Sequence, residues 1–323
     1  MSAKPFSSFS ILNWAPIIGA FFLFSADCLS QQDDQKRDVS EVYRKPERAD
    51  GDIRFLSYNL KNYLTMRRGD KESGKPEKEI SALVALIARH DPDIIGVSEI
   101  GSEEDLLDLQ KRLKNARVDL PEFEHTGGWD RVRKLGLLSR FPIIERNSPG
   151  ALTFDLEGRP WTINRGVLDV TIKAGGMELR FLGVHFKSKR EIEEASQELI
   201  RQGEAALVKE YSSEILAKAP DTKLFVYGDF NDTIMSPTLS RMRGRSNSKT
   251  HLADFYFKDS RGMLWTHFWN YQDTYARIDY VCISKAASPY LVGKESYIID
   301  DPRWFEASDH RALLLTINND KNR

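Results

Sequence analysis

Cysteine is almost absent from this chain of 323 residues, which contains only Cys28 and Cys282. Cys28 lies in an N-terminal segment that we expect to be removed, so one thiol remains in the mature chain. One thiol cannot form an internal disulfide, and Cys282 lies in the apolar run Tyr280-Val281-Cys282-Ile283. We therefore expect Cys282 to be a buried small side chain, and the fold to be held by its hydrophobic core.

An excess of charge of one sign is also missing, because 47 Lys and Arg residues balance 48 Asp and Glu residues. A nearly neutral chain has no overall positive field, so attraction to nucleic acid or an anionic membrane must come from local patches. The sequence also lacks internal repeats, low-complexity tracts and a second linker between about residue 50 and residue 317. We expect one domain at residues 51–318, a polar tail at 319–323, a monomer and no protein partner.

Long apolar runs are missing except near the N-terminus, where residues 11–24 follow Lys4 and precede a polar run that starts at Gln31. This pattern predicts a signal peptide at residues 1–30, a flexible polar lead-in at 31–50, and a secreted or periplasmic protein. A membrane anchor is the rival interpretation, but the run is short for a spanning helix and Pro16 interrupts it. Lipid modification of Cys28 is a third, and Asp27 directly before it argues against this. We expect no stable membrane anchor.

Strand and helix patterns alternate along the rest of the chain. Helices are predicted near residues 76–90, 102–115 and 191–217, the second of them capped by Ser102 with Asp105. Strands are predicted at residues 53–58, 93–98, 135–138, 143–144, 166–172, 177–184, 224–227, 264–269, 278–283 and 312–317. Many strands with few long helices indicate two packed mixed β-sheets with helices outside them.

Polar residues with carboxylate, amide or imidazole side chains stand beside six separate apolar runs. They are Asn59, Glu99, His185, Asp229 with Asn231, Asp279, and Asp309 with His310. A chain that repeatedly places such groups beside buried strands assembles them at one edge of a sheet. Hard oxygen ligands together with imidazole and amide donors suit Mg²⁺ or Mn²⁺ and a phosphate ester.

The strongest local pattern is Gly228-Asp229-Phe230-Asn231-Asp232. A turn alone would explain these residues, and the functional interpretation is that Asp229 activates water while Asn231 donates to a phosphate. Ser308-Asp309-His310 is similarly either a turn cap or a source of a metal ligand and an acid-base group. Glu99 follows a run that should be buried, where either a divalent cation or a basic side chain would compensate its charge.

The ordered set of motifs resembles the endonuclease/exonuclease/phosphatase superfamily, closest to its secreted bacterial nuclease-like members. The set comprises Tyr58-Asn59-Leu60-Lys61-Asn62, Ser98-Glu99, Leu138-Ser139-Arg140-Phe141-Pro142, His185, Gly228-Asp229-Phe230-Asn231, Arg277-Ile278-Asp279-Tyr280 and Ser308-Asp309-His310. The resemblance implies an α/β fold, a four-layer α/β/β/α sandwich, with the site at one edge. It also implies hydrolysis of a phosphate ester by direct attack of water, without a covalent enzyme intermediate.

The same resemblance assigns roles to individual residues. Glu99 would be the main metal ligand, assisted by Asn59 and Asp309. Asp229 would orient or deprotonate the water and Asn231 would hold a phosphoryl oxygen. His185 and His310 would stabilise the transition state or protonate the leaving oxygen, and Asp279 would pair with one of them. Two branches of the superfamily differ over which histidine this is, so the sequence leaves that choice open.

Three basic segments adjoin the motifs: Met66-Arg67-Arg68, Lys187 to Arg190, and Ser240 to Arg245. Charge runs are often simply solvated surface, but their position favours a polyanionic substrate bound by Lys187, Arg241 and Arg243, with Arg165 as a further phosphate contact. The leading hypothesis is a secreted metal-dependent phosphodiesterase acting on DNA or RNA. Alternatives are a lipid or sugar-phosphate hydrolase, for which the sequence shows no convincing apolar hairpin, and a catalytically dead nucleic-acid-binding module.

Overall fold

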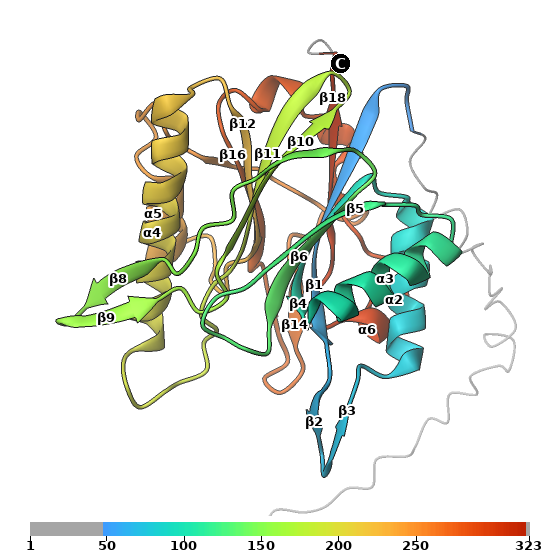
Figure 1. Cartoon of the computed structure of the whole chain (residues 1–323), viewed down its shortest axis with the longest axis horizontal. Helices are drawn as coiled ribbons and strands as arrows, with labels where there is room; N and C mark the ends of the chain where they lie inside the picture. Colours follow the sequence, from blue (N-terminus) through green and yellow to red (C-terminus); the bar gives the residue numbers. More distant parts are fainter. Residues whose placement is uncertain (1–47, 321–323) are drawn as a thin grey trace, which may run out of the picture. The chain divides into compact units, whose positions relative to one another are not determined.

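The computed structural model describes residues 48–320 of the chain. The predicted signal peptide, Cys28 and nearly all of the polar lead-in lie outside these residues, as do residues 321–323 of the predicted tail. Two six-stranded mixed sheets form the centre (Figure 1). In spatial order, the first contains β17 (Tyr297–Ile298), β18 (Leu313–Asn318), β1 (Asp52–Tyr63), β4 (Ile94–Ile100), β6 (Lys134–Ser139) and β5 (Glu122–Thr126). The second contains β13 (Ala253–Asp254), β16 (Asp279–Ile283), β12 (Lys223–Asp229), β11 (Met177–His185), β10 (Val167–Ala174) and β7 (Ile143–Arg146).

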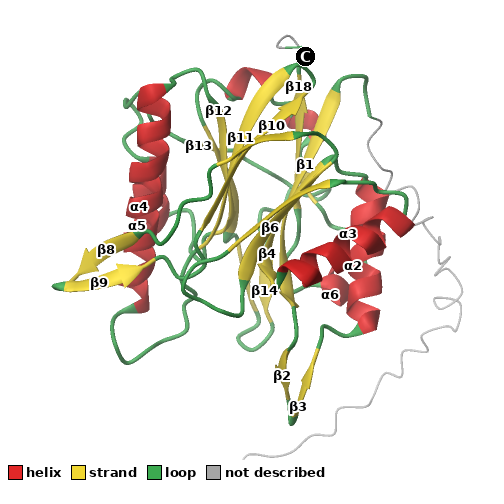
Figure 2. Ribbon diagram, viewed as in Figure 1, coloured by secondary structure: helices red, strands yellow, loops and turns green. Residues whose placement is uncertain are grey.

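Helices cover the outer face of each sheet, which confirms the predicted four layers (Figure 2). The helices α2 (Glu77–His90), α3 (Glu103–Asn115) and α6 (Trp304–Ala307) lie on the first sheet, and α4 (Gln197–Lys218) with α5 (Pro237–Arg243) on the second. Three hairpins extend from this framework: β2 (Met66–Arg68) with β3 (Lys71–Ser73), β8 (Thr153–Leu156) with β9 (Arg159–Thr162), and β14 (His267–Trp269) with β15 (Thr274–Ala276). Two short 3₁₀ turns span Ser288–Tyr290 and Gly293–Glu295.

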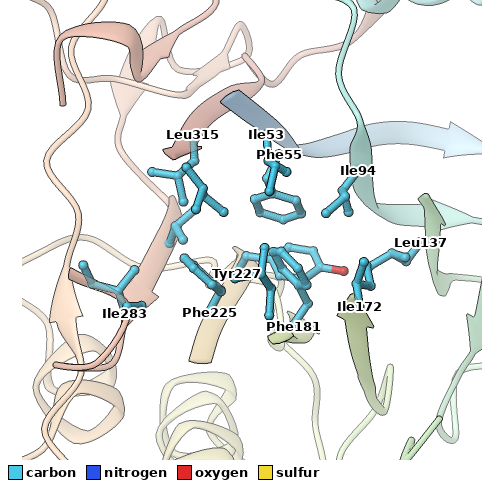
Figure 3. Packing of buried hydrophobic residues seen from close by; sticks show 14 of the residues in the cluster. Ile53, Phe55, Ile94, Leu137, Ile172, Phe181, Phe225, Tyr227, Ile283 and Leu315 are labelled. Atoms are coloured by element: carbon cyan, nitrogen blue, oxygen red, sulfur yellow. The ribbon is translucent and has the colours of Figure 1, made fainter. Parts of the chain in front are cut away.

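The core between the two sheets is apolar and aromatic. Phe55 from the first sheet meets Phe181 and Tyr227 from the second, with ring centroids 4.7 Å and 4.8 Å away (Figure 3). Alternate residues of each strand point into this layer, because side chains on a strand alternate between its two faces. The opposite faces of the sheets pack against the helices in two further apolar clusters. Burial on both faces fixes the register of every central strand.

The start of α4 differs from the prediction of a helix over residues 191–217. The helix begins at Gln197, where the Ser196 hydroxyl accepts the backbone N–H of Leu199 at 3.4 Å. Residues 191–195 form a connection that leads from the end of β11 to this cap. The predicted strand at residues 264–269 is likewise reduced to His267–Trp269. A helix needs a partner for its first N–H groups, and Ser196 supplies one.

Two predictions about individual residues are confirmed. Ser102 caps α3 in a reciprocal capping box with Asp105, because Ser102 accepts the N–H of Asp105 and Asp105 accepts the N–H of Ser102. Cys282 is fully buried and free, and burial raises the pKa of its thiol.

Within residues 48–320, no helix has the length and apolar character needed to cross a membrane.

Candidate active site

Three catalytic candidates stand in one row across the second sheet. His185 ends β11 and is paired in register with Asp229 at the end of β12, which in turn is paired with Asp279 at the start of β16. Register partners point to the same face of a sheet, so the three side chains share a face. That face is the inner one, because Phe225 and Tyr227, four and two residues before Asp229 in β12, point the same way and belong to the core between the sheets. The site therefore lies at the polar edge of the apolar layer between the two sheets.

The first sheet contributes an amide and a carboxylate to the same place. Asn59 of β1 donates from Nδ2 to Oδ2 of Asp229 at 3.0 Å and to Oε1 of Glu99 at 3.4 Å. Its amide oxygen accepts the backbone N–H of Lys61 at 3.0 Å. Asn59 thus bridges carboxylates from both sheets through its nitrogen. Its assignment as a metal ligand stays a prediction.

Glu99 reaches the site through an irregularity in β4. The pairing of β4 with β1 and with β6 shifts register around this residue, and Glu99 has a φ of 61°. Such a bulge re-aims the side chain of the extra residue. Oε2 of Glu99 then accepts the backbone N–H of Asn62 at 2.9 Å, and Arg133 approaches the same oxygen at 4.0 Å. The half-buried charge of Glu99 therefore has a basic neighbour and also faces the cavity described below.

The segment before β18 brings His310 to the row. The Ser308 hydroxyl donates to the carbonyl of Asn59 at 2.8 Å and accepts the backbone N–H of His310 at 3.1 Å. Nδ1 of His310 lies 2.9 Å from Oδ2 of Asp279. The structure therefore resolves the choice that the sequence left open, because Asp279 pairs with His310.

Asp229 lies between the two histidines. Its Oδ2 atom is 3.6 Å from Nε2 of His185 and 3.7 Å from Nε2 of His310. Burial raises the pKa of Asp229 to about 7, although the positive charge of His310 opposes this shift. A carboxylate with a pKa near neutrality is matched to accepting a proton near pH 7.

The two histidines differ in charge. Burial alone would lower the pKa of His310, but the nearby carboxylate of Asp279, reinforced by Asp229 and Asp309, raises it to about 10. His185 has no such compensation: burial, followed by the charge of Arg165, holds its pKa well below the usual value. Nδ1 of His185 is buried without a hydrogen-bond partner among the described residues. At neutral pH these two rings are therefore one imidazolium, His310, and one neutral imidazole, His185.

Glu99, His185, Asp229 and His310 line a cavity of about 360 Å³, whereas Asn59 and Asp279 contact them without lining it. Its wall also includes Asn231, whose backbone N–H donates to Oδ1 of Asp229 at 2.8 Å and whose Nδ2 donates to the carbonyl of Phe186 at 3.0 Å. Five basic side chains lie around the cavity: Lys61, Arg133, Arg165, Lys187 and Arg190. The wall therefore combines three carboxylates, Glu99, Asp229 and Asp309, with these basic groups, which suits a phosphate ester bound beside a cation.

The predicted substrate-binding residues divide into two pairs. Arg165 and Lys187 line the cavity, and Arg165 contacts Asp130 through Nε at 3.5 Å. Arg241 and Arg243 lie on α5 and are not among the residues that line it, because this segment is a helix over the outer face of the second sheet. The expected direct phosphate contact by Arg241 and Arg243 is therefore not reproduced at this cavity.

Sequence reasoning did not name three residues of the cavity, Arg133, Asn164 and His267, and it quoted Asn62 only as part of a motif. The backbones of His267 and His310 pair in an isolated antiparallel β-bridge, and the centroids of their two rings are 4.5 Å apart. Burial, together with the charge of His310, lowers the pKa of His267. One sequence feature could have identified His267: it is one of only six histidines in the chain, and it lies within the predicted strand at residues 264–269.

A divalent cation fits the donors present. Glu99, Asp229 and Asp309 offer carboxylate oxygens on the cavity wall, and the buried amide oxygen of Asn62 has no hydrogen-bond partner among the described residues. Two groups of three side chains bring their ligand atoms within 4.8 Å of one another: His267 with Asp309 and His310, and Asp229 with Asp279 and His310. The carboxylate and amide oxygens suit Mg²⁺ or Mn²⁺, as expected from the sequence, whereas His310 cannot be a ligand while its ring is protonated.

Comparison with known proteins agrees with this geometry. The sequence model of the Endonuclease/Exonuclease/phosphatase family matches residues 56–310, which contain every catalytic candidate named above. The chain belongs to this family. Its members are metal-dependent phosphoesterases, among them nucleases, phosphatases and sphingomyelinases, so the chain is placed among hydrolases that typically use a divalent metal.

Solved structures of the family share the fold at low sequence identity. The catalytic domain of human Nocturnin is 17% identical with a TM-score of 0.59, covering 82% of this chain and 94% of that one. A family protein from Bacteroides thetaiotaomicron is 20% identical with a TM-score of 0.55, covering 83% and 98%. Sphingomyelinase C from Streptomyces griseocarneus is 15% identical with a TM-score of 0.55, covering 83% and 99%. No curated protein matches the chain. At these identities the likeness concerns the fold alone.

Proposed function

We propose that this chain is an exported, Mg²⁺- or Mn²⁺-dependent phosphodiesterase that hydrolyses DNA or RNA with little sequence preference, as a monomer. The observation that carries the proposal is Asp229 held between a charged and a neutral histidine, in a cavity surrounded by basic side chains. Phosphate contacts supply most of the affinity of sequence-independent nucleic-acid binding, and Arg165, Lys187 and Arg190 are placed to make them.

The chemistry follows from the protonation states. Asp229 accepts the proton of the attacking water, which its raised pKa favours near pH 7. His310, kept protonated by Asp279, donates toward the negative charge that develops on the phosphoryl group or the leaving oxygen. His185 contributes a neutral imidazole on the opposite side of Asp229. A divalent ion held by Glu99 with Asp309 and Asn62 would supply further positive charge for the phosphate oxygens.

A second candidate function has one observation in its favour. The hairpin β14–β15 exposes aromatic side chains, with Trp269, Tyr271 and Tyr275 exposed by 45%, 85% and 56%. The sequence had shown no convincing apolar hairpin, and this finding corrects that assessment. Exposed Trp and Tyr side chains are favoured at membrane interfaces, so a phosphodiester on a lipid is the alternative substrate.

One assay separates the two candidates. The purified protein is incubated with plasmid, RNA, sphingomyelin vesicles, inositol phosphates and bis-(p-nitrophenyl) phosphate, each with Mg²⁺ or with EDTA. We expect cleavage of nucleic acid with Mg²⁺ and its loss with EDTA. Cleavage of plasmid that survives EDTA would contradict the metal mechanism. Hydrolysis confined to sphingomyelin or to phosphomonoesters would contradict the nuclease proposal.

Export is tested separately. Sequencing the N-terminus of the protein recovered outside the cytoplasm should give a chain that starts at Gln31, directly after the proposed cleavage site. A chain that retains residues 1–30 would contradict cleavage there.

A further inference from the structure

A second cavity adjoins the catalytic one. It has a volume of about 440 Å³, and Asn164 and Lys187 line both cavities. Its remaining wall is largely aromatic and apolar, with Trp129, Trp161 and Pro160 among its residues. A volume of this size accommodates a small organic group. A substrate whose phosphate lies beside His185 and Asp229 can therefore extend a neighbouring group into the second cavity.

The loop that carries Trp129 is anchored by backbone contacts to the segment that contains Asn164, a residue of both cavities. Backbone packs directly on backbone there, because a methyl group at Gly128 would lie 2.4 Å from the carbonyl oxygen of Ile163. The N–H of Asp130 also donates to the carbonyl of Asn164 at 2.7 Å. Trp129 is 77% exposed on this anchored loop. The backbone is anchored on both sides of Trp129, so the exposed indole is presented on the wall of the second cavity.

The wall that carries Trp161 is anchored differently. The hairpin β8–β9 packs on α4 through Phe154, whose Cε2 atom would lie 2.2 Å from a methyl group at Gly203. Only glycine leaves room for this ring at that position of the helix. The N–H of Ile163, just after β9, donates to the carbonyl of Leu152 at 2.9 Å. Two independent contacts thus hold the second tryptophan beside the cavity.

The charges around the second cavity balance. Lys187 contributes an ammonium group, which also donates to the carbonyls of Ser188 and Arg190 at 3.1 Å and 2.7 Å. Glu194 contributes a carboxylate to the same wall. Two indole rings beside a balanced pair of charges offer stacking faces to a neutral planar ring. A cationic head group would also pack on indole faces, so phosphocholine is included in the test below.

We propose that this second cavity is a subsite for a nucleobase attached to the phosphate that is cleaved. The inference rests on the proposed function for the position of the phosphate, and it names the group that lies next to it. Trp129 and Trp161 provide stacking surfaces, and Asn164 with Thr162 provides hydrogen-bonding groups at the edge. Stacking is tolerant of base identity, because every base has a π-face, so the subsite is compatible with cleavage of many sequences.

Binding of adenosine 5′-monophosphate and of ribose 5-phosphate, measured by calorimetry with Mg²⁺, tests the subsite. We expect the full-length protein to bind the nucleotide about 10-fold more tightly than the sugar phosphate. Trp129→Ala and Trp161→Ala should each remove most of this preference while leaving the affinity for ribose 5-phosphate unchanged. Phe305→Ala is the matched control, because Phe305 is 62% exposed and lies outside both cavities. It should keep the preference.

Three results would overturn the subsite: equal affinity for the two ligands, a preference that survives both tryptophan substitutions, or tighter tryptophan-dependent binding of phosphocholine. A cleavage experiment keeps this outcome separate from the proposed function. It compares a dinucleotide with an analogue that lacks the base next to the cleaved phosphate. Equal KM values for both compounds would refute the subsite and leave the phosphodiesterase standing. A protein that prefers the nucleotide in calorimetry but cleaves neither compound would retain the subsite and lose the proposed function.

Discussion

The two sides of the active site contain the same residue type in opposite states. His185 and His310 approach the same oxygen of Asp229 at nearly equal distances, 3.6 Å and 3.7 Å. Asp279 holds His310 as an imidazolium, whereas burial without a carboxylate partner on Nδ1 holds His185 neutral. The comparison teaches that the neighbour on the far ring nitrogen, and not the distance to Asp229, determines the charge of each histidine.

The largest expected effect comes from removing the carboxylate that both sides share. Asp229→Asn should reduce kcat by up to about 10⁴-fold, because an amide cannot accept the proton of water. Steady-state hydrolysis of bis-(p-nitrophenyl) phosphate measures the loss, and the unfolding temperature checks that the variant is folded. A folded variant with activity near that of the wild type would show that another group activates the water.

The next effect should come from the neutral side. His185→Gln should reduce kcat on the order of 10²- to 10³-fold, the usual cost of losing one donor to the transition state. Because His185 is already neutral, the pH at which activity declines on the alkaline side should stay where it is. If the alkaline limb of the pH–rate profile moves in this variant, His185 and not His310 is the histidine that carries the charge.

The charged side is expected to respond differently. Wild-type activity should rise as Asp229 deprotonates near pH 7 and decline as His310 deprotonates near pH 10. Asp279→Asn removes the charge that raises the pKa of His310, so this pKa falls toward about 6.5 and the alkaline limb moves to lower pH. The rate at the optimum should fall about 10- to 100-fold, because the ring also loses its orienting partner.

A matched control for this substitution is Asp169→Asn. Asp169 is a buried carboxylate of the same sheet that pairs with Arg180 at 2.6 Å, and it does not line the cavity. Its loss should lower stability and leave the alkaline limb unchanged. A shift of the limb in both variants would mean that general loss of buried charge, and not the pairing with His310, is responsible.

The smallest effect concerns the hydrogen bonds of Ser308, which link β1 to the segment before β18 within the first sheet. Ser308→Ala removes the hydroxyl that joins the carbonyl of Asn59 to the N–H of His310, both in buried surroundings. The free energy of unfolding in urea should fall by about 1–3 kcal/mol, the usual cost of leaving such groups without partners. Ser288→Ala, at an exposed position, serves as the control and should change it by less than about 0.5 kcal/mol. Equal stability of the two variants would show that the link contributes nothing.

Much of the site was predictable because strands alternate. Asn59, Asp229 and Asp279 each continue the set of core-facing positions of their strands, and in the sequence each is a polar residue beside an apolar run. Glu99 breaks this rule. Ile95 and Val97 of β4 pack against the helices, and alternation would place Glu99 with them on the outer face. The bulge turns the side chain of Glu99 inward instead. No residue pattern in the strand predicts that bulge.

By itself, the sequence determined the two-sheet architecture and the set of groups that meet at its edge. The spacing of apolar residues is a local property of the chain. It can be read from the sequence without knowing which strands pair with one another. The tertiary structure alone decided which histidine Asp279 charges, where Glu99 points, and that Arg241 and Arg243 lie away from the cavity. These features depend on distances between residues far apart in the chain, and such distances exist only once the two sheets have packed together.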